Sequence, residues 1–419
     1  MMTVDRKSIA NNVEPGNATA GKGGKVGRIG KSERNLLLAG LACAVVGFAA
    51  WTILLTQGLL GNTGLNNGFV WGMFIAVFAF FVGFGAGSQL VFSYIVLSGR
   101  EELKGLAKSA IALALACAAA AGVAILIDLG NISHIMAMII GTNFRSPLSW
   151  DMVALSLFLV VALLEYISLI AGWRFTRKLA VLGIITAVAL QIVEGLLFSL
   201  QSSHAWWNTP IMPLDFLVVA FVSGFALMLL VAYVRNVNSA IPILAKWTAI
   251  CIAVHLVLSV CEFGALFIEN TPTSMAILQA LGSMWWLYGT ELLLPLIAMV
   301  ILFRAGKTVP RKTALIASVL TIIGLIAHRL MLLYPSYNAP SLWTGISNMD
   351  SEVWGYPIST GQFAAGGNTF AVVPGYVPGP LEWVGSLLPL GVALVAVVIL
   401  WLIADKVKAS KARKAEAAK

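Results

Sequence analysis

The sequence predicts an all-α integral membrane protein, and three observations lead to that fold class. Of the 419 residues, 59% are hydrophobic and only 11% are charged, with a mean hydropathy of +0.90. A soluble domain carries about 25% charged residues. Ten apolar stretches recur along the chain, and the Lys and Arg residues gather in alternate connections between them.

The apolar stretches predict helices, because a helix satisfies its own backbone groups, as lipid requires. Membrane β-strands are excluded, because they are shorter and alternate apolar with polar residues. About 20 apolar residues cross a bilayer as a helix. We therefore expect spans near residues 36–57, 69–97, 107–128, 150–172, 178–203, 213–234, 243–268, 274–303, 313–334 and 380–404.

The basic residues predict the orientation of these spans. Twenty-five of the 27 Lys and Arg residues lie in the two tails and in the loops near 98–108, 173–178, 235–246 and 304–312. Basic residues that flank membrane spans stay in the cytoplasm. Both termini are therefore expected in the cytoplasm. Basic residues in the cytoplasmic loops, which are attracted to anionic membrane lipid, account for the net charge of +9. The charge therefore does not imply binding to nucleic acid.

The longest segments outside the spans differ in character. Residues 1–35 are rich in Gly and Lys and are predicted to be a disordered tail. Their length and polarity are untypical of a signal peptide, so we expect the first span to be retained. The outer loop 335–379 has no Lys or Arg and many aromatic residues. Long loops are commonly functional, so this loop is expected to form a folded cap or a docking surface for a partner.

No metal or haem site is expected in this chain. The cysteines lie within spans and lack CxxC spacing, so iron–sulfur and zinc sites are not indicated and plain apolar packing is expected; they are Cys43, Cys117, Cys251 and Cys261. Haem b needs two histidines on facing helices at one depth. His255 and His328 are the one conceivable pair, but their expected depths differ.

Four glutamates within the spans are the first sign of function: Glu165, Glu194, Glu262 and Glu291. An ionised acid at mid-membrane costs about 3 kcal/mol on insertion scales. Four would cost about 12 kcal/mol, comparable with a domain's whole stability of about 5–15 kcal/mol. We expect them to face the interior and to be protonated, paired or hydrated. Such carboxyls can carry protons, or they can simply hydrogen-bond neighbouring helices.

Helical spacing groups further polar residues with these glutamates. His255, Ser259 and Glu262 share one helix face, and about 10 Å separates His255 from Glu262 along the axis, a distance that suits a water-bridged proton transfer. Arg329 follows His328 and keeps its charge when buried. It therefore needs an acid from a neighbouring helix, and Glu262 is a candidate.

Gly83 and Gly87 have the small-xxx-small spacing that lets helices approach closely. Packing of a second helix is the expected role of this pair. A flat cofactor or a lipid tail against the same smooth face is the alternative interpretation.

Several motifs resemble the membrane subunits of the polysulfide reductase and nitrite reductase (NrfD/PsrC) family. The outer loop after the third span reads Asp128-Leu129-Gly130 and then Ser146-Pro147-Leu148-Ser149-Trp150. These segments resemble the family's Asp-Leu-Gly turn and its Ser-Pro-Met/Leu-Ser-Trp turn. Trp71 before the glycine motif, and the segment 206–210, resemble two further family segments. The resemblance covers roughly residues 69–334.

This resemblance implies two antiparallel four-helix bundles with one flanking helix at each end. Ten helices resemble the branch that includes the D subunit of the Qrc menaquinone reductase complex. The expected organisation is a cytoplasmic tail (1–35), a flanking helix with its loop (36–68), a quinone-side bundle (69–203), a second bundle (204–334), a periplasmic loop (335–379), a tenth helix (380–404) and a cytoplasmic tail (405–419).

The resemblance also implies a menaquinone site at the outer end of the first bundle, beside a periplasmic iron–sulfur subunit. Molybdopterin-type and multihaem cytochrome c subunits are further expected partners. The family histidine at the start of the second helix is missing, and His134 or His204 are the candidates to replace it. The expected quinone residues are Asp128, His134, Arg145, Trp150, Glu194 and His204. The expected proton route uses Glu165, His255, Glu262, Glu291, His328 and Arg329.

The sequence thus predicts a quinone-reactive subunit of a respiratory complex in the bacterial inner membrane, inactive alone and taking up protons through its helices. A proton-coupled secondary transporter would use the same carboxylates, but such folds show helices broken at the membrane midplane. Here the prolines cluster at the span ends, with Pro295 as the exception. A structural anchor is the third interpretation, and it would gain nothing from four buried glutamates.

Overall fold

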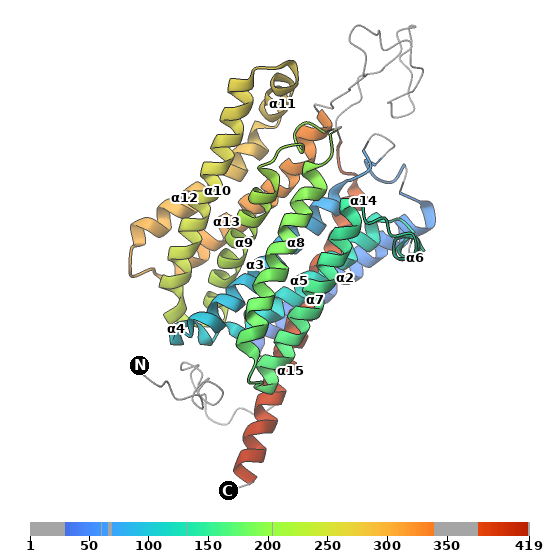
Figure 1. Cartoon of the computed structure of the whole chain (residues 1–419). Helices are drawn as coiled ribbons and strands as arrows, with labels where there is room; N and C mark the ends of the chain where they lie inside the picture. The colour runs from blue at the N-terminus through green and yellow to red at the C-terminus, as the bar shows by residue number, and fades with distance from the viewer. Residues whose placement is uncertain are drawn as a thin grey trace, which may run out of the picture.

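A computed structural model describes residues 30–59, 61–65, 69–131, 133–202, 204–338 and 376–417 (Figure 1). The elements, in chain order, are α2 (Lys31–Gln57), α3 (Met73–Ser98), α4 (Glu101–Lys104), α5 (Ala107–Asp128), α6 (His134–Ile140), α7 (Pro147–Ala171), α8 (Thr176–Ser199), α9 (Met212–Val234), the 3-10 turn η1 (Asn238–Ala240), α10 (Ile241–Glu269), α11 (Pro272–Ser283), α12 (Trp285–Ala305), α13 (Arg311–Asn338), α14 (Pro380–Gly385) and α15 (Leu387–Ala417).

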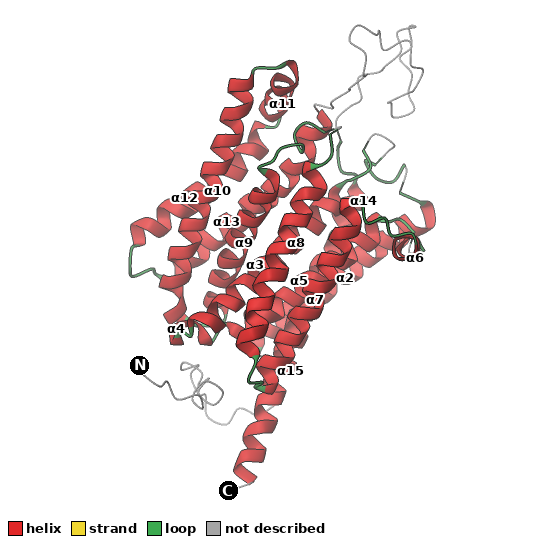
Figure 2. Cartoon of the chain, viewed as in Figure 1, coloured by secondary structure: helices red, strands yellow, loops and turns green. Residues whose placement is uncertain are grey.

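The predicted all-α membrane fold is confirmed. Within the described ranges, ten helices are long and apolar enough to cross a membrane. Figure 2 shows these helices joined by loops, and the coloured part of the chain contains no strand. The end of the molecule that carries α6, α11 and α14 is called the outer end below, following the orientation predicted from the basic residues. The opposite end, where α4 lies, is called the inner end (Figure 1).

The spans pack in two groups of four. In the first group α3 contacts α5 and α8, and α7 contacts the same two helices. In the second group α9 contacts α10 and α13, and α12 contacts the same two helices. The groups meet where α3 and α8 lie against α9, and where α3 also contacts α13. The flanking helices α2 and α15 pack against each other, and α15 runs along α5.

Helix α3 occupies the joint between the two groups. In the most apolar 18-residue segment of α3, 89% of the residues are buried. In the corresponding segment of the span that contains α10, only 17% are buried. Gly87 of α3 lies against Gly224 of α9, so closely that an added Cβ on Gly87 would stand 2.0 Å from the Ala220 carbonyl oxygen. The Ser223 hydroxyl also donates to the Gly83 carbonyl at 3.0 Å. The predicted role of this glycine pair in helix packing is confirmed.

The predicted eighth span, 274–303, is wrong at its beginning. Residues 272–283 form the separate helix α11, and the chain leaves helical geometry at Met284 before α12 begins. Local chemistry explains the separate start, because the Thr271 hydroxyl accepts from the Ser274 backbone N–H at 3.1 Å and Pro272 opens the first turn. The apolar stretch continues across this break, so hydropathy alone predicted a single helix.

Several other predicted boundaries also move, among them those of the second and tenth spans. The second span begins at Met73 rather than at residue 69, and the tenth is divided into α14 and α15 at Ser386. Most of the predicted cap or docking surface at 335–379, and the tail up to residue 29, lie outside the described residues.

Candidate functional site

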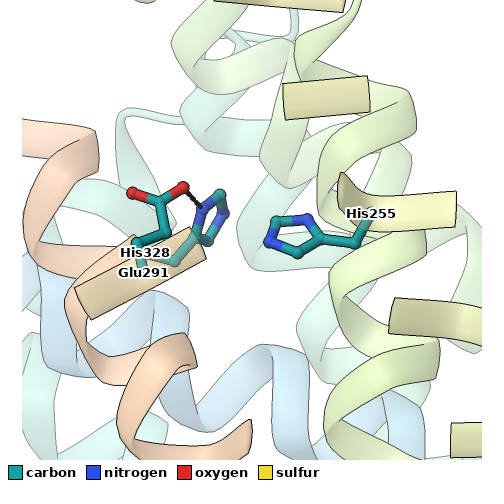
Figure 3. A group of neighbouring side chains, drawn as sticks. All are labelled: His255, Glu291 and His328. Carbon is teal, nitrogen blue, oxygen red and sulfur yellow. Dashed lines mark hydrogen bonds and ion pairs between the residues drawn. The ribbon is translucent and has the colours of Figure 1, made fainter. Parts of the chain in front are cut away.

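Three charged side chains from three helices meet inside the second group. The imidazole of His328 on α13 lies between two carboxylates. Its Nδ1 is 2.9 Å from Oε1 of Glu291 on α12, and its Nε2 is 3.1 Å from Oδ2 of Asp215 on α9. Both ring nitrogens are thus hydrogen-bonded to acids, as Figure 3 shows for Glu291. Helix α13 packs against both α9 and α12, so the packing of the group holds His328 between the two acids.

The hydrogen bonds of this triad fix how many protons it carries. A carboxylate only accepts, so each N···O hydrogen bond needs one proton, and two protons are shared among three groups. An imidazolium between two carboxylates satisfies that count, and so does a neutral imidazole beside one carboxylic acid. A proton gained at one end and lost at the other leaves the same bonds in place. The arrangement can therefore pass a proton between Glu291 and Asp215.

His255 of α10 completes the cluster. Its side chain is fully buried, its ring stands 5.1 Å from the ring of His328 at an interplanar angle of 89°, and its Nδ1 is 3.6 Å from Oδ1 of Asp215. Neither ring nitrogen of His255 has a hydrogen-bond partner among the described residues. The expectation that His255 and His328 sit at different depths is wrong, because helix α10 carries His255 directly against α13 (Figure 3).

Two cavities lie beside the cluster and towards the outer end. A small cavity of about 20 Å³, enough for one water molecule, is lined by Asp215, Glu291, His328 and Glu262, among others. A wider one of about 190 Å³ lies between the α8–α9 loop and the outer turns of α10. Both are lined by Trp206 and Glu262. Glu262 is therefore the acid that the two cavities have in common.

Arg329 lies between the two helix groups. Its side chain is buried, its guanidinium carbon lies 4.2 Å from the ring centroid of Phe216, and Nη2 reaches Gly83 on α3. Glu194, Asp215 and Glu291 are the acids that act on it electrostatically, but its Nη1 and Nη2 have no hydrogen-bond partner among the described residues. No ion pair joins Arg329 to Glu262 within the described chain, so that predicted pairing is wrong. Glu194 belongs to the first group, so this cation faces acids on both sides of the joint.

The first group holds three further buried carboxyls, those of Asp151, Glu165 and Glu194. Glu165 of α7 accepts a hydrogen bond from the amide of Gln89 on α3, and both side chains are fully buried. Gly183 of α8 makes room for this pair, because an added Cβ there would stand 2.2 Å from Nε2 of Gln89. Glu194 of α8 accepts a hydrogen bond from Gln191 at 3.1 Å and interacts electrostatically with Asp151 of α7.

Asp128 lies at the outer end of the first group, beside a second acid that the sequence pattern did not reveal. Glu382 of α14 is fully buried and accepts from the backbone N–H of Gly64 and of Gly379, at 2.7 and 2.8 Å. The Tyr376 hydroxyl donates to the same carboxylate. Burial and that carboxylate raise the pKa of Tyr376 far above its usual range, so the phenol keeps its proton. Asp128 interacts electrostatically with Glu382, and its Oδ1 is buried without a hydrogen-bond partner in the described residues.

His204, in the α8–α9 connection, packs beside this outer region. Its Nδ1 is 2.8 Å from the Ser336 hydroxyl, and its ring centroid lies 4.2 Å from that of Trp207. Burial lowers the pKa of His204 below its ordinary value. Its ring also contacts Tyr337, which interacts electrostatically with Asp128. His204 is therefore a neutral polar group at neutral pH. Both His204 and Asp128 interact with Tyr337.

The other predicted quinone residues are more exposed. His134 begins α6, Trp150 lies in the first turn of α7, and Arg145 lies in the turn between these helices. The His134 ring contacts the Leu129 carbonyl at 3.1 Å, and the Trp150 indole donates to the Phe144 carbonyl at 2.9 Å. The Arg145 side chain is exposed. These three residues and Asp128 occupy the outer end of the first group, whereas Glu194 lies with Arg329 at the joint.

Sequence comparison connects this architecture with known proteins. The polysulphide reductase family NrfD matches residues 61–341, which is about two thirds of the chain. The chain belongs to the NrfD family.

Individual relatives of this NrfD protein carry reductase names. A Halobacterium salinarum protein, provisionally named as the C membrane subunit of a dimethyl sulfoxide reductase, is 26% identical over 74% of this chain and 80% of its own length. The C subunit of selenate reductase from Mesobacillus selenatarsenatis is 24% identical over 85% of this chain and 89% of its own. The Hdr-like menaquinol oxidoreductase integral membrane subunit of Archaeoglobus fulgidus is 25% identical over 45% of this chain and 47% of its own.

The family resemblance that the Asp-Leu-Gly and Ser-Pro-Leu-Ser-Trp turns indicated is thus confirmed, whereas the ten-helix branch and the likeness to the Qrc complex stay predictions. In this NrfD protein, several residues that interact with the predicted site residues were not themselves predicted from the sequence. Asp215 was not among the expected proton residues, although an Asp among apolar residues at a span end was a usable signal. Gln89 and Glu382 gave less signal, because only the fold places Gln89 beside Glu165 and Glu382 beside Asp128.

Proposed function

We propose that this NrfD protein is the quinone-reactive membrane subunit of a bacterial respiratory oxidoreductase complex, inactive without its partner subunits. It would exchange electrons between a periplasmic iron–sulfur subunit and menaquinone near the periplasmic face of the inner membrane, with both termini in the cytoplasm. The observation that carries this proposal is the family match across residues 61–341. The A. fulgidus relative, whose name includes menaquinol oxidoreductase, supports menaquinone as the quinone.

The residues at the outer end of the first group fit a quinone headgroup. Asp128 offers a buried carboxyl oxygen without a hydrogen-bond partner in the described chain. Tyr337 interacts with both Asp128 and His204. The quinone supplies two-electron chemistry that needs two protons. Asp128 and His204 would hold the protons that go to, or come from, its oxygens, with His134 and Arg145 at the rim of the site.

The surface of α6 suits the apolar tail of such a molecule. Large apolar side chains are exposed along this short helix and the turn that follows, at Met136, Ile139, Ile140, Phe144 and Trp150. A helix that presents an apolar face at the membrane boundary lies in the interface between lipid and water. A lipid-soluble substrate would therefore reach Asp128 from the bilayer, past α6.

Proton uptake through the helix groups is the second part of the proposal. The ionisable side chains of the interior form a discontinuous series from Glu165 through Glu194 and Arg329 to the Asp215–His328–Glu291 triad. Glu262 and His255 extend it along α10. Protons drawn from the cytoplasm along this series towards the outer end would make turnover charge-separating.

The transporter interpretation loses its structural support. The eighth span is broken at Met284, but α12 alone has 21 residues. At 1.5 Å per residue it extends about 31 Å, the thickness of the hydrocarbon core. The break therefore lies at the edge of the bilayer, whereas secondary transporters break helices at the midplane around their substrate.

Quinone reduction by the purified complex tests the first part. Asp128→Asn should lower electron transfer to a water-soluble menaquinone analogue at least tenfold. Asp151→Asn is the matched control, because Asp151 likewise has a buried Oδ1 that lacks a hydrogen-bond partner among the described residues, but on α7. Equal losses in both variants would contradict a site at Asp128. An absorbance spectrum of the isolated chain tests the expectation that it holds no haem or iron–sulfur cluster.

The complex in liposomes tests the second part. A membrane potential that builds up during turnover and collapses with a protonophore is expected. Turnover without any potential would contradict the route from the cytoplasm while leaving the quinone site intact. Co-purification of iron–sulfur, molybdopterin-type or multihaem subunits would identify the partners.

A further inference from the structure

We propose that His255, His328 and Glu291 form a binding site for a divalent transition-metal cation of the zinc type, reached from the outer face. One ligand atom of each residue lies within 4.8 Å of the other two, and the three come from three different helices (Figure 3). This site is separate from the quinone region, and it does not depend on quinone chemistry.

The orientation of His255 is the observation that points to a ligand. A fully buried imidazole normally satisfies at least one of its ring nitrogens, because an unmade hydrogen bond costs roughly 1–3 kcal/mol. Neither nitrogen of His255 has a hydrogen-bond partner in the described chain, although Nδ1 stands 3.6 Å from Oδ1 of Asp215, and the ring points toward His328 (Figure 3). A neutral imidazole with a free lone pair is the form that binds a metal. A cation between the two rings would satisfy His255.

The ligand types select the kind of cation. Two imidazoles with one carboxylate are typical of zinc and related transition metals, whereas Mg²⁺ and Ca²⁺ prefer oxygen ligands. Asp215 supplies the usual supporting contact, because it lies 3.1 Å from Nε2 of His328. A carboxylate that accepts the second ring N–H of a ligand histidine fixes the orientation of that ring. Three protein ligands leave a fourth position for a water molecule, and the adjoining cavity has room for one.

The geometry requires only a small contraction. Tetrahedral ligands at about 2.0–2.1 Å from zinc stand about 3.4 Å apart. The widest pair of the present cluster, within 4.8 Å, has to close by about 1.4 Å. Glu291 can move, because its Oε2 has no hydrogen-bond partner in the described residues. The metal takes the place of the proton in the Glu291–His328 hydrogen bond, so at least one proton is released for each cation bound.

The route to the site is acidic. The wide outer cavity is lined by Glu262 and Glu269, and Glu262 also lines the small cavity at the triad. Carboxylates along a narrow path attract cations. A hydrated divalent cation can therefore approach the cluster from the outer side.

Zinc binding to the detergent-purified complex tests the site. Equilibrium dialysis with radioactive zinc should show one tight site that depends on this chain, and X-ray absorption at the zinc edge should show two imidazole ligands. His255→Gln should weaken binding at least tenfold. Because one proton leaves, the affinity should rise about tenfold for each pH unit in the range where that proton is held.

Matched variants distinguish this site from surface binding. His134→Gln removes an exposed histidine on α6 and should leave the zinc affinity unchanged. His255→Gln removes no hydrogen bond seen in the structure, so it should fold even if His328→Gln does not. Wild-type affinity in His255→Gln, or loss of binding in His134→Gln alone, would overturn the proposal and indicate an adventitious ion only.

Discussion

His328 of α13 and Glu291 of α12 share a hydrogen bond of 2.9 Å in the middle of the second helix group. The bond joins an acid and a base that the chain separates by 37 residues, and the other side of the ring faces Asp215. A proton can therefore move along this contact without any change of helix position. The pair is where proton movement through the second group is most readily tested.

Glu291→Gln should stop proton transfer through this contact and leave the fold intact. Glutamine keeps the shape and can still hydrogen-bond His328, but it cannot gain or lose a proton at neutral pH. We expect the membrane potential built per electron in liposomes to fall at least several-fold, with a change in melting temperature of only a few degrees. Glu269→Gln, at the exposed outer end of α10, is the control. An unchanged potential in Glu291→Gln would remove the triad from the route.

Gly183→Ala should disrupt the buried Glu165–Gln89 pair. The added methyl group would stand 2.2 Å from the Gln89 amide nitrogen and 2.5 Å from a Glu165 oxygen, on side chains that are already fully buried. Overpacking of this kind costs about 1–3 kcal/mol. Gly122→Ala on α5 is the control, because a Cβ there meets open space and alanine favours the helix by about 1 kcal/mol. Thermal unfolding in detergent measures both, and equal melting temperatures would contradict the prediction.

Arg329→Gln should impair both stability and turnover. It removes a buried cation that faces Glu194, Asp215 and Glu291 at the joint of the two groups. Arg329→Lys keeps the charge but loses the flat guanidinium over Phe216. We expect turnover to fall in the order wild type, Lys variant, Gln variant, with at least a tenfold loss in the last. Steady-state turnover and thermal unfolding check the order. A Gln variant that matches wild type in both would show that the charge is dispensable.

His204 should make the protein less stable as the pH falls. Burial lowers its pKa in the folded state, whereas the unfolded chain has the ordinary value near 6.5. Below that value the unfolded state binds a proton that the folded state resists, so stability declines until the pH passes the folded pKa. The melting temperature of His204→Gln should therefore fall less between pH 7 and pH 5 than that of wild type. Parallel curves would contradict the assigned burial effect.

The sequence predicted those features of the fold that depend on the local composition of the chain. Lipid demands long apolar helices, and the basic loops indicate their order, so all ten spans were found. The α11–α12 boundary was missed, because a break between two apolar helices leaves no mark in hydropathy, and only the Thr271–Pro272 cap signals it.

The sites were harder to predict, because they depend on helix rotation and on side chains from several helices. Helical spacing placed His255 and Glu262 on one face of α10, but it could not show that His255 meets His328 or that Asp215 joins them. The predicted pairing of Arg329 with Glu262 was wrong for the same reason. Glu194 and Asp215 come from helices whose orientation about their own axes a single sequence does not reveal.

The contact between Gly87 and Gly224 limits how the protein can work. Two helices whose backbones touch can pivot about the crossing point, but they cannot move closer or slide past each other without a collision. The contact therefore resists sliding of one helix group along the other at this crossing. Under the proposed function, we expect electron transfer near the first group to influence protons in the second through a change of electric field across this joint, rather than through a sliding movement of helices.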